Sequence, residues 1–269
     1  MSGLVAGLPM YDFPWTVPAL DAMWAWMATY IRARGAEAPE SLSRDLPLEA
    51  LWRSPGLLFG QTCGYPYRHG LSGVGELIAT RVYGFEGCEG ASHCSLIVAR
   101  HGDPRADLAE FRGARAAING RDSNTGMNLF RAALAPLAQG APYFCEVALT
   151  GAHAASLAAV ARGTSDIAAI DCVTFGLLAR GAPELVAGVR ILARTPSSPG
   201  LPFIASLALS AEQRALVRAA LFAALDEASL AEAWRALGVV GAEVLRPDAY
   251  RRIDELEAQA AALGYSDLA

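Results

Sequence analysis

Residues 119–126 (NGRDSNTG) hold the side chains with the clearest chemical use. They follow a predicted strand and open a predicted helix, so they lie at the carboxyl end of a strand, where open α/β sheets bind ligands. The polar groups of Ser123, Asn124 and Thr125, with the free N–H groups of the helix N-terminus, could donate hydrogen bonds to an anion such as a phosphate or a carboxylate. The simpler alternative is that Asp122 or Ser123 only caps the helix.

Two further strand ends carry polar groups. His153 lies in the first turn of a predicted helix, where the helix dipole disfavours a cation, so a neutral ring could donate one hydrogen bond to an oxyanion. Asp171 ends the next strand and could accept a hydrogen bond from an amine or hydroxyl group of a ligand, or it could cap the following helix. The three strand ends together predict a site for a small anionic or zwitterionic ligand.

Polar and aromatic residues also follow the two predicted strands in the first part of the chain. Amide and aromatic groups at such places are typical of pocket linings, although each one could also be an ordinary turn residue. The candidates are Tyr11, Asp12, Gln61, Thr62 and Tyr65.

A hydrolase is the first competing chemistry. Ser123, His153 and Asp171 have the residue types of a catalytic triad, but the serine lacks a G-x-S-x-G elbow. Cys63 and Cys172 both lie at strand ends, where a cysteine nucleophile beside a histidine is conceivable. Neither pattern is specific, so we expect no catalytic residue and a protein that is not an enzyme.

Metal and cofactor motifs are equally weak. Cys88, His93 and Cys94 could ligate zinc, but the chain has no C-x-x-C pair there and a fourth ligand is missing. No G-x-G-x-x-G fingerprint of a dinucleotide fold occurs. We therefore expect no metal and no cofactor.

The charge of the chain excludes several classes of protein. Its 269 residues include 22 Arg and no Lys, 27 acidic residues, and a formal net charge of -5. A net-negative chain without a basic tract is not expected to bind nucleic acid. Without Lys, neither a Walker-type phosphate loop nor a Schiff base can form. Apart from Arg121, no arginine is reliably placed at a strand end, so anion binding would depend on helix N-termini and neutral donors.

The apolar content indicates a sizeable core and no membrane span. Hydrophobic residues make up 53% of the chain, yet no apolar run reaches the roughly 20 residues that a spanning helix needs. Residues 1–15 have no basic region and no long apolar core, so they predict a first strand and not a signal peptide. Five cysteines at irregular spacing favour reduced thiols, although Cys88 and Cys94 could pair.

Hydrophobic periodicity predicts an alternation of strands and helices, which favours a mostly parallel sheet with right-handed crossovers. Ser210 and Gln213 form a capping-box signature. Strands are expected at 4–8, 57–59, 77–83, 95–100, 114–119, 145–149, 167–170, 189–193 and 203–207. Helices are expected from 17 to about 35 and at 48–52, 108–111, 126–137, 153–162, 173–179, 210–221, 230–237 and 247–264.

Three ordered motifs resemble the phosphonate-type substrate-binding proteins of ABC transporters. Residues 107–126 (DLAEFRGARAAINGRDSNTG) resemble their L-x-x-L-x-G-K-x-V-A-x-x-D-x-x-S-x-S-G segment. Residues 150–163 (TGAHAASLAAVARG) resemble G-x-H-x-x-x-x-x-V-x-x-G, and residues 165–171 (SDIAAID) resemble the strand A-D-V-A-x-x-D/N that follows. The match spans roughly residues 100–205. Asn124 and Thr125 replace small hydroxylated residues of the pattern.

The resemblance implies an α/β, two-lobe type 2 periplasmic-binding-protein fold, in which each lobe is a mostly parallel sheet flanked by helices and a ligand cleft lies between them. Lobe one would comprise residues 1–94 and 196–269, and lobe two residues 95–195. Residues 123–126 and His153 would hold an anionic head group, Asp171 a cationic or hydroxylated tail, and Tyr11 and Tyr65 would close the cleft.

The expected function is therefore capture of a phosphate- or phosphonate-like solute for an ABC permease, in the periplasm by resemblance. The alternative is a cytosolic biosynthetic enzyme or ligand sensor on the same fold, which the reduced cysteines and the expected lack of a signal peptide favour.

Overall fold

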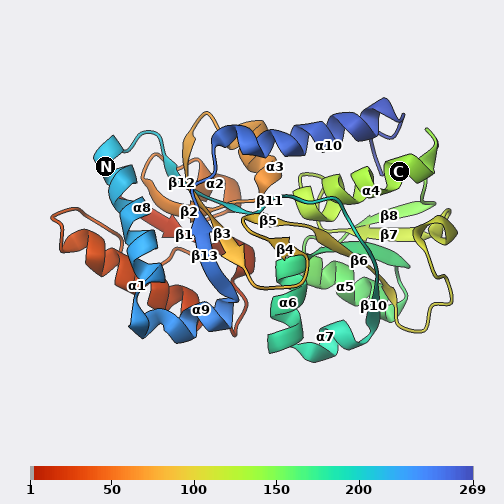
Figure 1. The fold of residues 1–269 in the computed structure, drawn as a ribbon, viewed down its shortest axis with the longest axis horizontal. Coiled ribbons are helices and arrows are strands. Elements are labelled where there is room, and N and C mark those ends of the chain that lie inside the picture. Colours follow the sequence, from red (N-terminus) through yellow and green to blue (C-terminus); the bar gives the residue numbers. More distant parts are fainter. Residues whose placement is uncertain (1–2, 269) are drawn as a thin grey trace. The chain divides into compact units, whose positions relative to one another are not determined.

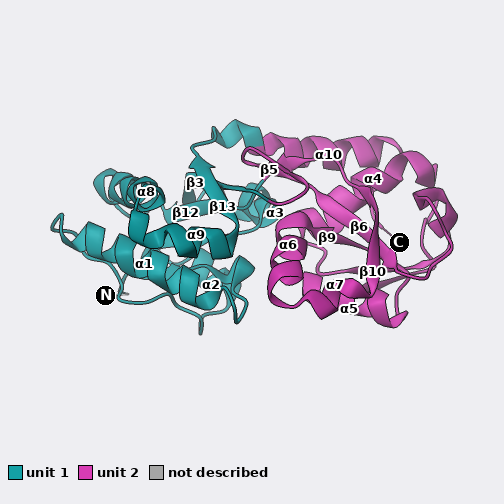
Figure 2. Ribbon diagram, turned by 60° about the horizontal axis from the view of Figure 1, so that its bottom comes forward, with its two compact units in different colours: residues 1–84, 200–249 teal, residues 85–199, 250–269 magenta. Residues whose placement is uncertain are grey.

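The computed structural model of the chain describes residues 3–268 (Figure 1). The chain forms two compact units (Figure 2). Unit 1 comprises the residues up to Gly84 together with Gly200–Ala249, and unit 2 comprises Phe85–Pro199 and the residues from Tyr250 on. These boundaries differ from the expected 94/95 and 195/196, and the C-terminal segment belongs to unit 2.

Unit 1 is built on a five-stranded sheet of order β1-β2-β12-β3-β13. Its strands are β1 (Val5–Gly7), β2 (Leu57–Gln61), β3 (Gly75–Tyr83), β12 (Pro202–Ser206) and β13 (Val239–Glu243). Its helical elements are η1 (Pro9–Tyr11), α1 (Val17–Arg32), α2 (Leu48–Trp52), α3 (Gly64–Pro66), η2 (Tyr67–Leu71), α8 (Ala211–Leu225), η5 (Ala228–Leu230) and α9 (Ala231–Leu237).

The core of unit 1 forms because α1 buries one apolar face. Trp24 is 1% exposed and stacks on Phe59 of β2, with 6.0 Å between the ring centroids. Phe59 in turn stacks on Phe203 of β12, at 4.6 Å. The expected capping box is confirmed at the start of α8, where Ser210 and Gln213 satisfy each other's backbone N–H groups.

Unit 2 has a five-stranded sheet of order β10-β6-β9-β7-β8 and a small sheet of order β11-β5-β4. Its strands are β4 (Cys88–Glu89), β5 (Ser92–His93), β6 (Ser95–Arg100), β7 (Arg115–Ile118), β8 (Glu146–Leu149), β9 (Ile167–Asp171), β10 (Val189–Arg194) and β11 (Ser198–Pro199). Its helical elements are η3 (Leu108–Phe111), η4 (Asn124–Asn128), α4 (Leu129–Ala138), α5 (His153–Arg162), α6 (Cys172–Gly181), α7 (Pro183–Ala187) and α10 (Arg251–Ala262). The element η6 (Pro247–Tyr250) leads into α10.

Arg131 explains why the C-terminal segment belongs to unit 2. This buried side chain of α4 forms an ion pair with Glu257 of α10 at 3.2 Å. It also donates to the backbone oxygen of Ser266 at 2.6 Å. The pattern of apolar residues in 247–264 predicts the helix but carries no sign of this partner.

The sheets are more mixed than the expected parallel arrangement. In unit 2, β7 pairs in parallel with β8 and with β9, while β6 runs antiparallel to both β9 and β10. In unit 1, β1 and β2 are parallel, and β12 and β13 pair antiparallel with their neighbours. The strands in antiparallel pairs include β6, β10, β12 and β13. The alternation of strands and helices along the chain does not predict their direction.

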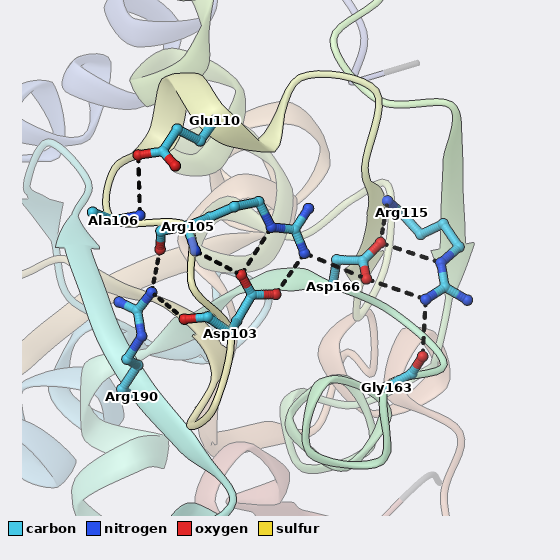
Figure 3. A network of polar contacts seen from close by, with 8 residues as sticks. All are labelled: Asp103, Arg105, Ala106, Glu110, Arg115, Gly163, Asp166 and Arg190. Atoms are coloured by element: carbon cyan, nitrogen blue, oxygen red, sulfur yellow. Dashed lines mark hydrogen bonds and ion pairs between the residues drawn. The ribbon is translucent and has the colours of Figure 1, made fainter.

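A charged network holds the amino ends of β7 and β9 in unit 2 (Figure 3). The guanidinium of Arg105 contacts Asp103 at 2.9 and 2.6 Å, and Arg115 contacts Asp166 at 3.1 and 3.2 Å. Arg190 of β10 donates to the backbone oxygen of Asp103. These arginines each have a protein partner, and they lie at the end of the strands opposite to the polar residues 119–126.

Candidate ligand-binding site

The three polar strand ends meet at one edge of the unit 2 sheet. β7, β8 and β9 run in parallel, so their carboxyl ends lie together. β6 runs the other way, and its first residue Ser95 pairs with Asp171, the last residue of β9. In open α/β sheets this carboxyl edge is where ligands bind.

The turn at residues 123–126 is shaped by Ser123 and Gly126. Ser123 caps η4, because its Oγ accepts a hydrogen bond from the backbone N–H of Gly126 at 2.9 Å. A Cβ at Gly126 would lie 1.8 Å from Oδ1 of Asn119 and 3.1 Å from Cε1 of His153, so only glycine fits. The capping role weighed from the sequence is therefore present, and glycine brings the turn against His153.

Asn124 is 1% exposed and is held through both ends of its amide. Its Nδ2 donates to Oγ of Ser198 on β11 at 2.8 Å, and its Oδ1 accepts from Nδ2 of Asn128 at 3.2 Å. Asn128 also donates to the backbone oxygen of Ile253 in α10, at 3.2 Å. This amide chain fixes the turn in place.

Thr125 and His153 form the contact that joins two of the predicted strand ends. Thr125 Oγ1 lies 2.9 Å from Nε2 of His153, and its backbone oxygen accepts a hydrogen bond from Oγ of Ser95 at 2.7 Å. Burial lowers the pKa of His153, which the charge of Asp171 partly opposes. The ring is therefore neutral near pH 7 and has one N–H to donate.

Asp171 occupies the third strand end and contacts Thr174 and His93 in unit 2. Its Oδ1 accepts from the backbone N–H of Thr174 at 2.7 Å, so the capping alternative weighed from the sequence is also present. Its Oδ2 lies 3.3 Å from Nδ1 of His93, and both side chains are at most 3% exposed. Burial lowers the pKa of His93, and the charge of Asp171 opposes that effect.

In unit 1, Tyr11 and Asp12 follow β1 as expected but make different contacts. Tyr11 is 3% exposed, and its ring meets the edge of Tyr83 of β3, with centroids 5.6 Å apart. Both oxygens of Asp12 are held by Arg44, at 2.8 and 3.1 Å. The carboxylate of Asp12 thus already has a cationic partner within its own unit.

Gln61, Thr62 and Tyr65 follow β2. Gln61 and Thr62 are fully buried. Among the described residues, neither the Oε1 nor the Nε2 atom of Gln61 has a hydrogen-bond partner, which is costly for a buried amide. Thr62 Oγ1 donates to the backbone oxygen of Cys63 at 3.3 Å. The ring of Tyr65 lies against His69, with centroids 4.2 Å apart.

Sequence reasoning missed three polar residues at the unit 2 edge as site candidates. The sequence offers His93 only as a possible zinc ligand, and it gives no sign that Ser95 or Ser198 belongs to the site. No motif marks them, because Ser95 and Ser198 reach this edge on strands whose pairing the sequence does not reveal. Arg121, the one arginine placed at a strand end, pairs instead with Asp267 at 2.9 Å.

The geometry does not assemble the hydrolase triad that was weighed. Ser123 Oγ is occupied by the N–H of Gly126, and His153 Nε2 contacts Thr125. Within residues 3–268, no group of three or more His, Cys, Asp or Glu side chains is placed to hold a metal ion. What the edge offers is a set of neutral donors beside a helix N-terminus.

In the part of the chain that the structure describes, no helix is both long and apolar enough to cross a membrane. A search of curated proteins finds no significant match to the chain. Solved structures of similar fold are found over nearly the whole chain.

A binding protein component of an ABC phosphonate transporter from Pseudomonas aeruginosa has a TM-score of 0.76, with 16% identity over 97% of this chain and 87% of that chain. PhnD1 from Prochlorococcus marinus, solved with methylphosphonate, has a TM-score of 0.75, with 13% identity over 96% and 98% of the two chains. A Xanthomonas citri protein bound to ATP has a TM-score of 0.71, with 18% identity over 98% of each chain.

At these identities the solved structures establish the fold. The Pseudomonas and Prochlorococcus proteins have the type 2 periplasmic-binding-protein fold, so the expected fold class is confirmed. The family model for the phosphonate periplasmic substrate-binding proteins of ABC transporters matches residues 58–250, which is well over half of the chain. The chain belongs to this family of solute-binding proteins, which serve ABC importers.

Proposed function

We propose that this chain binds a small phosphonate-like anion at the carboxyl edge of the unit 2 sheet, with Ser123, Asn124, Thr125, Gly126 and His153 around the head group. The observation that carries the proposal is the 2.9 Å contact between Thr125 and His153 at the start of η4. Two motifs that the family pattern associates with the head group are joined there by a hydrogen bond.

Neutral donors suit a dianionic or monoanionic phosphonate in this setting. The η4 and α4 segments run on without a break from Asn124 to Ala138. Their N-terminus presents backbone N–H groups and the positive end of a helix dipole. With Arg121 turned to Asp267, we assign the affinity to hydrogen-bond geometry and not to a cationic side chain.

Asp171 gives the ligand a second expected feature. Its carboxylate lies at the same edge and is shared with His93. A ligand that carries an amine or a hydroxyl group next to its anionic head would place that group near Asp171. We therefore include aminoalkylphosphonates in the ligand class. Their phosphonate group would lie at the helix N-terminus, and their amine would lie near the carboxylate of Asp171.

Unit 1 carries a second set of candidate ligand-binding residues, namely Tyr11, Asp12, Gln61, Thr62 and Tyr65. Gln61 is the strongest member, because its buried amide has no partner among the described residues. Asp12 is the weakest, because Arg44 holds both of its oxygens. We assign the chain a transport role with an ABC permease in the periplasm, without catalysis, on the strength of its family.

A ligand panel tests the proposal. The purified chain is titrated with methylphosphonate, 2-aminoethylphosphonate, phosphate and malate, first by the shift in melting temperature and then by calorimetry. We expect the phosphonates to stabilise the chain, since a ligand at about 100 times its Kd adds about 2.7 kcal/mol to the free energy of unfolding. No shift with any phosphonate at millimolar concentration would reject this ligand class.

The variant Thr125→Val tests the assigned site. It keeps the shape of the side chain and removes the hydroxyl group that contacts His153, so we expect the Kd for methylphosphonate to rise about 10-fold, as for the loss of one buried hydrogen bond. Thr164→Val is the matched control, because Thr164 Oγ1 only donates to the backbone oxygen of Ala159 at the far end of α5. Equal affinities for the two variants would place the ligand elsewhere.

A further inference from the structure

Three cysteines gather beside the unit 2 edge, although they are far apart in the sequence. Cys88 Sγ lies 3.4 Å from Cys172 Sγ, across 84 positions of the chain. Cys94 is close enough to Cys172 that each thiol shifts the pKa of the other. None of the five cysteines of the chain is joined in a disulfide in the structure. The site proposed for the anion does not use these three.

The backbone holds the cluster together. Cys94 donates its N–H to the backbone oxygen of Gly87 at 3.0 Å, and Cys172 donates its N–H to that of Cys94 at 3.2 Å. Gly87 has a φ of +91°, and a Cβ there would lie 2.9 Å from Cys94 Sγ and 3.0 Å from Cys172 Cβ. Only glycine both adopts this conformation readily and leaves room for the two neighbouring thiols.

Cys172 borders a cavity of about 280 Å³, whose other lining residues include Phe85, Glu86, Leu96, Phe175 and Arg180. Cys172 itself is only 1% exposed. Cys88 is half-buried and lies on β4, beside α6 (Figure 1). A small reagent can therefore meet Cys88 at the surface, while Cys172 is buried in the wall of the cavity.

We propose that Cys88 and Cys172 are a dithiol that a small-molecule disulfide such as glutathione disulfide oxidises to an intramolecular disulfide. The sulfur of Cys88, as its thiolate, attacks the glutathione disulfide and forms a mixed disulfide, and one glutathione leaves as a thiolate that takes up the proton lost by Cys88. The sulfur of Cys172 then attacks Cys88, the second glutathione leaves as a thiolate, and it takes up the proton lost by Cys172. Two electrons pass from the two cysteines to the glutathione disulfide.

The second step is the slower one. Hydrogen bonds to Cys88 and Cys94, together with burial, raise the pKa of the Cys172 thiol. The hydrogen bond from Cys172 lowers the pKa of Cys94, but Cys94 is 3% exposed and has no direct access to a reagent. The reaction is therefore slow near neutral pH and faster at mildly alkaline pH, so the experiment measures the product at equilibrium.

The disulfide would tie the β4–β5 hairpin to the first residue of α6. That hairpin carries His93, and Asp171 directly precedes Cys172, so the bond would fix the two segments that form the His93–Asp171 pair. The proposal does not depend on which anion binds, because the chemistry of the thiols can be measured without a ligand.

Oxidation of the full chain in a glutathione redox buffer at about pH 8 tests the proposal. Thiol titration of the denatured product should fall from five thiols to three, and peptide mass mapping should identify the Cys88–Cys172 linkage. The loop that the bond closes is long, so we expect the melting temperature to rise by several degrees and to return on reduction.

Variants decide which sulfurs take part. Cys88→Ser and Cys172→Ser should each prevent the linkage, whereas Cys94→Ser and the exposed-site control Cys145→Ser should leave it intact. Cys88→Ser alters a half-buried position, so it remains a valid test even if Cys172→Ser impairs folding. A Cys94–Cys172 or Cys88–Cys94 linkage, mixed disulfides only, or five free thiols at equilibrium would each overturn the proposal.

Discussion

At the scale of single residues, the candidate site depends on histidines that are kept neutral. Burial lowers the pKa of both His93 and His153, even though Asp171 lies close to each. A neutral His153 can donate or accept a hydrogen bond with Thr125 without bringing a positive charge to the helix N-terminus. The same burial makes the folded state sensitive to acid.

We predict that the free energy of unfolding falls as the pH drops below about 6.5, the pKa of an unfolded histidine. The folded histidines bind a proton less readily than the unfolded ones, so protonation favours unfolding. Urea unfolding at pH 7.5, 6.5 and 5.5 measures the effect. The variant His153→Gln should reduce the slope, and a slope that stays the same would show that His153 does not contribute to it.

From the ion pair of Asp103 we predict a second fall in the free energy of unfolding, at more acidic pH. The guanidinium of Arg105 holds the pKa of this carboxyl at about 2. Its contribution is present above about pH 4 and is lost as the pH falls towards 2. Asp103→Asn should therefore cost about 1–2 kcal/mol at pH 7 and about a third of that at pH 2.5. An equal cost at both pH values would contradict the role of the charge.

The sequence could predict that polar residues lie at three strand ends of unit 2, because each of them follows a strand with clear apolar periodicity. Thr125 and His153 were proposed from their positions, and the structure brings them into contact. His93 and Ser95 could not be predicted, because their place depends on β6 pairing antiparallel with β9. Partners such as Arg44 for Asp12 also leave no local pattern.

At the scale of the elements, the strands and helices with strong periodicity were predicted well. The helix expected from residue 17 and the strands around residues 57, 95 and 167 appear as α1, β2, β6 and β9. β13 was missed because its sequence, VVGAE, contains a glycine and has only one buried residue. The short β4, β5 and β11 are defined by pairing between distant segments and not by composition.

Strand β3 carries a buried cation that has no carboxylate partner among the described residues. Arg81 of β3 is 2% exposed, and its Nη2 contacts Sδ of Met23 at 2.8 Å. Its guanidinium lies 4.6 Å from the ring centroid of Phe203 and 5.8 Å from that of Trp234. Among the described residues, its Nε and Nη1 atoms have no hydrogen-bond partner. Burial of such a group costs free energy of folding.

We predict that Arg81→Met keeps or raises the free energy of unfolding, by up to about 4 kcal/mol, because an apolar side chain of similar length replaces an uncompensated charge. Chemical denaturation measures the change. The matched control is Arg218→Met, since Arg218 has partners in Glu76 and in the backbone oxygens of Leu77 and Ile78. The control should lose about 1–3 kcal/mol, and a larger loss for Arg81→Met would contradict the prediction.

At the scale of the whole molecule, the family is established while the sequence has diverged widely. Solved structures with 13–18% identity share the fold over almost the full chain. Apolar periodicity and a few strand-end motifs are enough to keep that fold, since many apolar side chains can fill the same core. The identity of the ligand depends on a handful of polar groups and is therefore not carried by the fold.

A crystal structure of the chain grown in saturating methylphosphonate tests the central claim most directly. We predict phosphonate oxygens within about 3.2 Å of the polar groups at residues 123–126 and of His153. The Arg105 and Arg115 network at the amino ends of the strands should remain without ligand. A phosphonate bound at that network, or at any other place away from residues 123–126 and His153, would contradict the account.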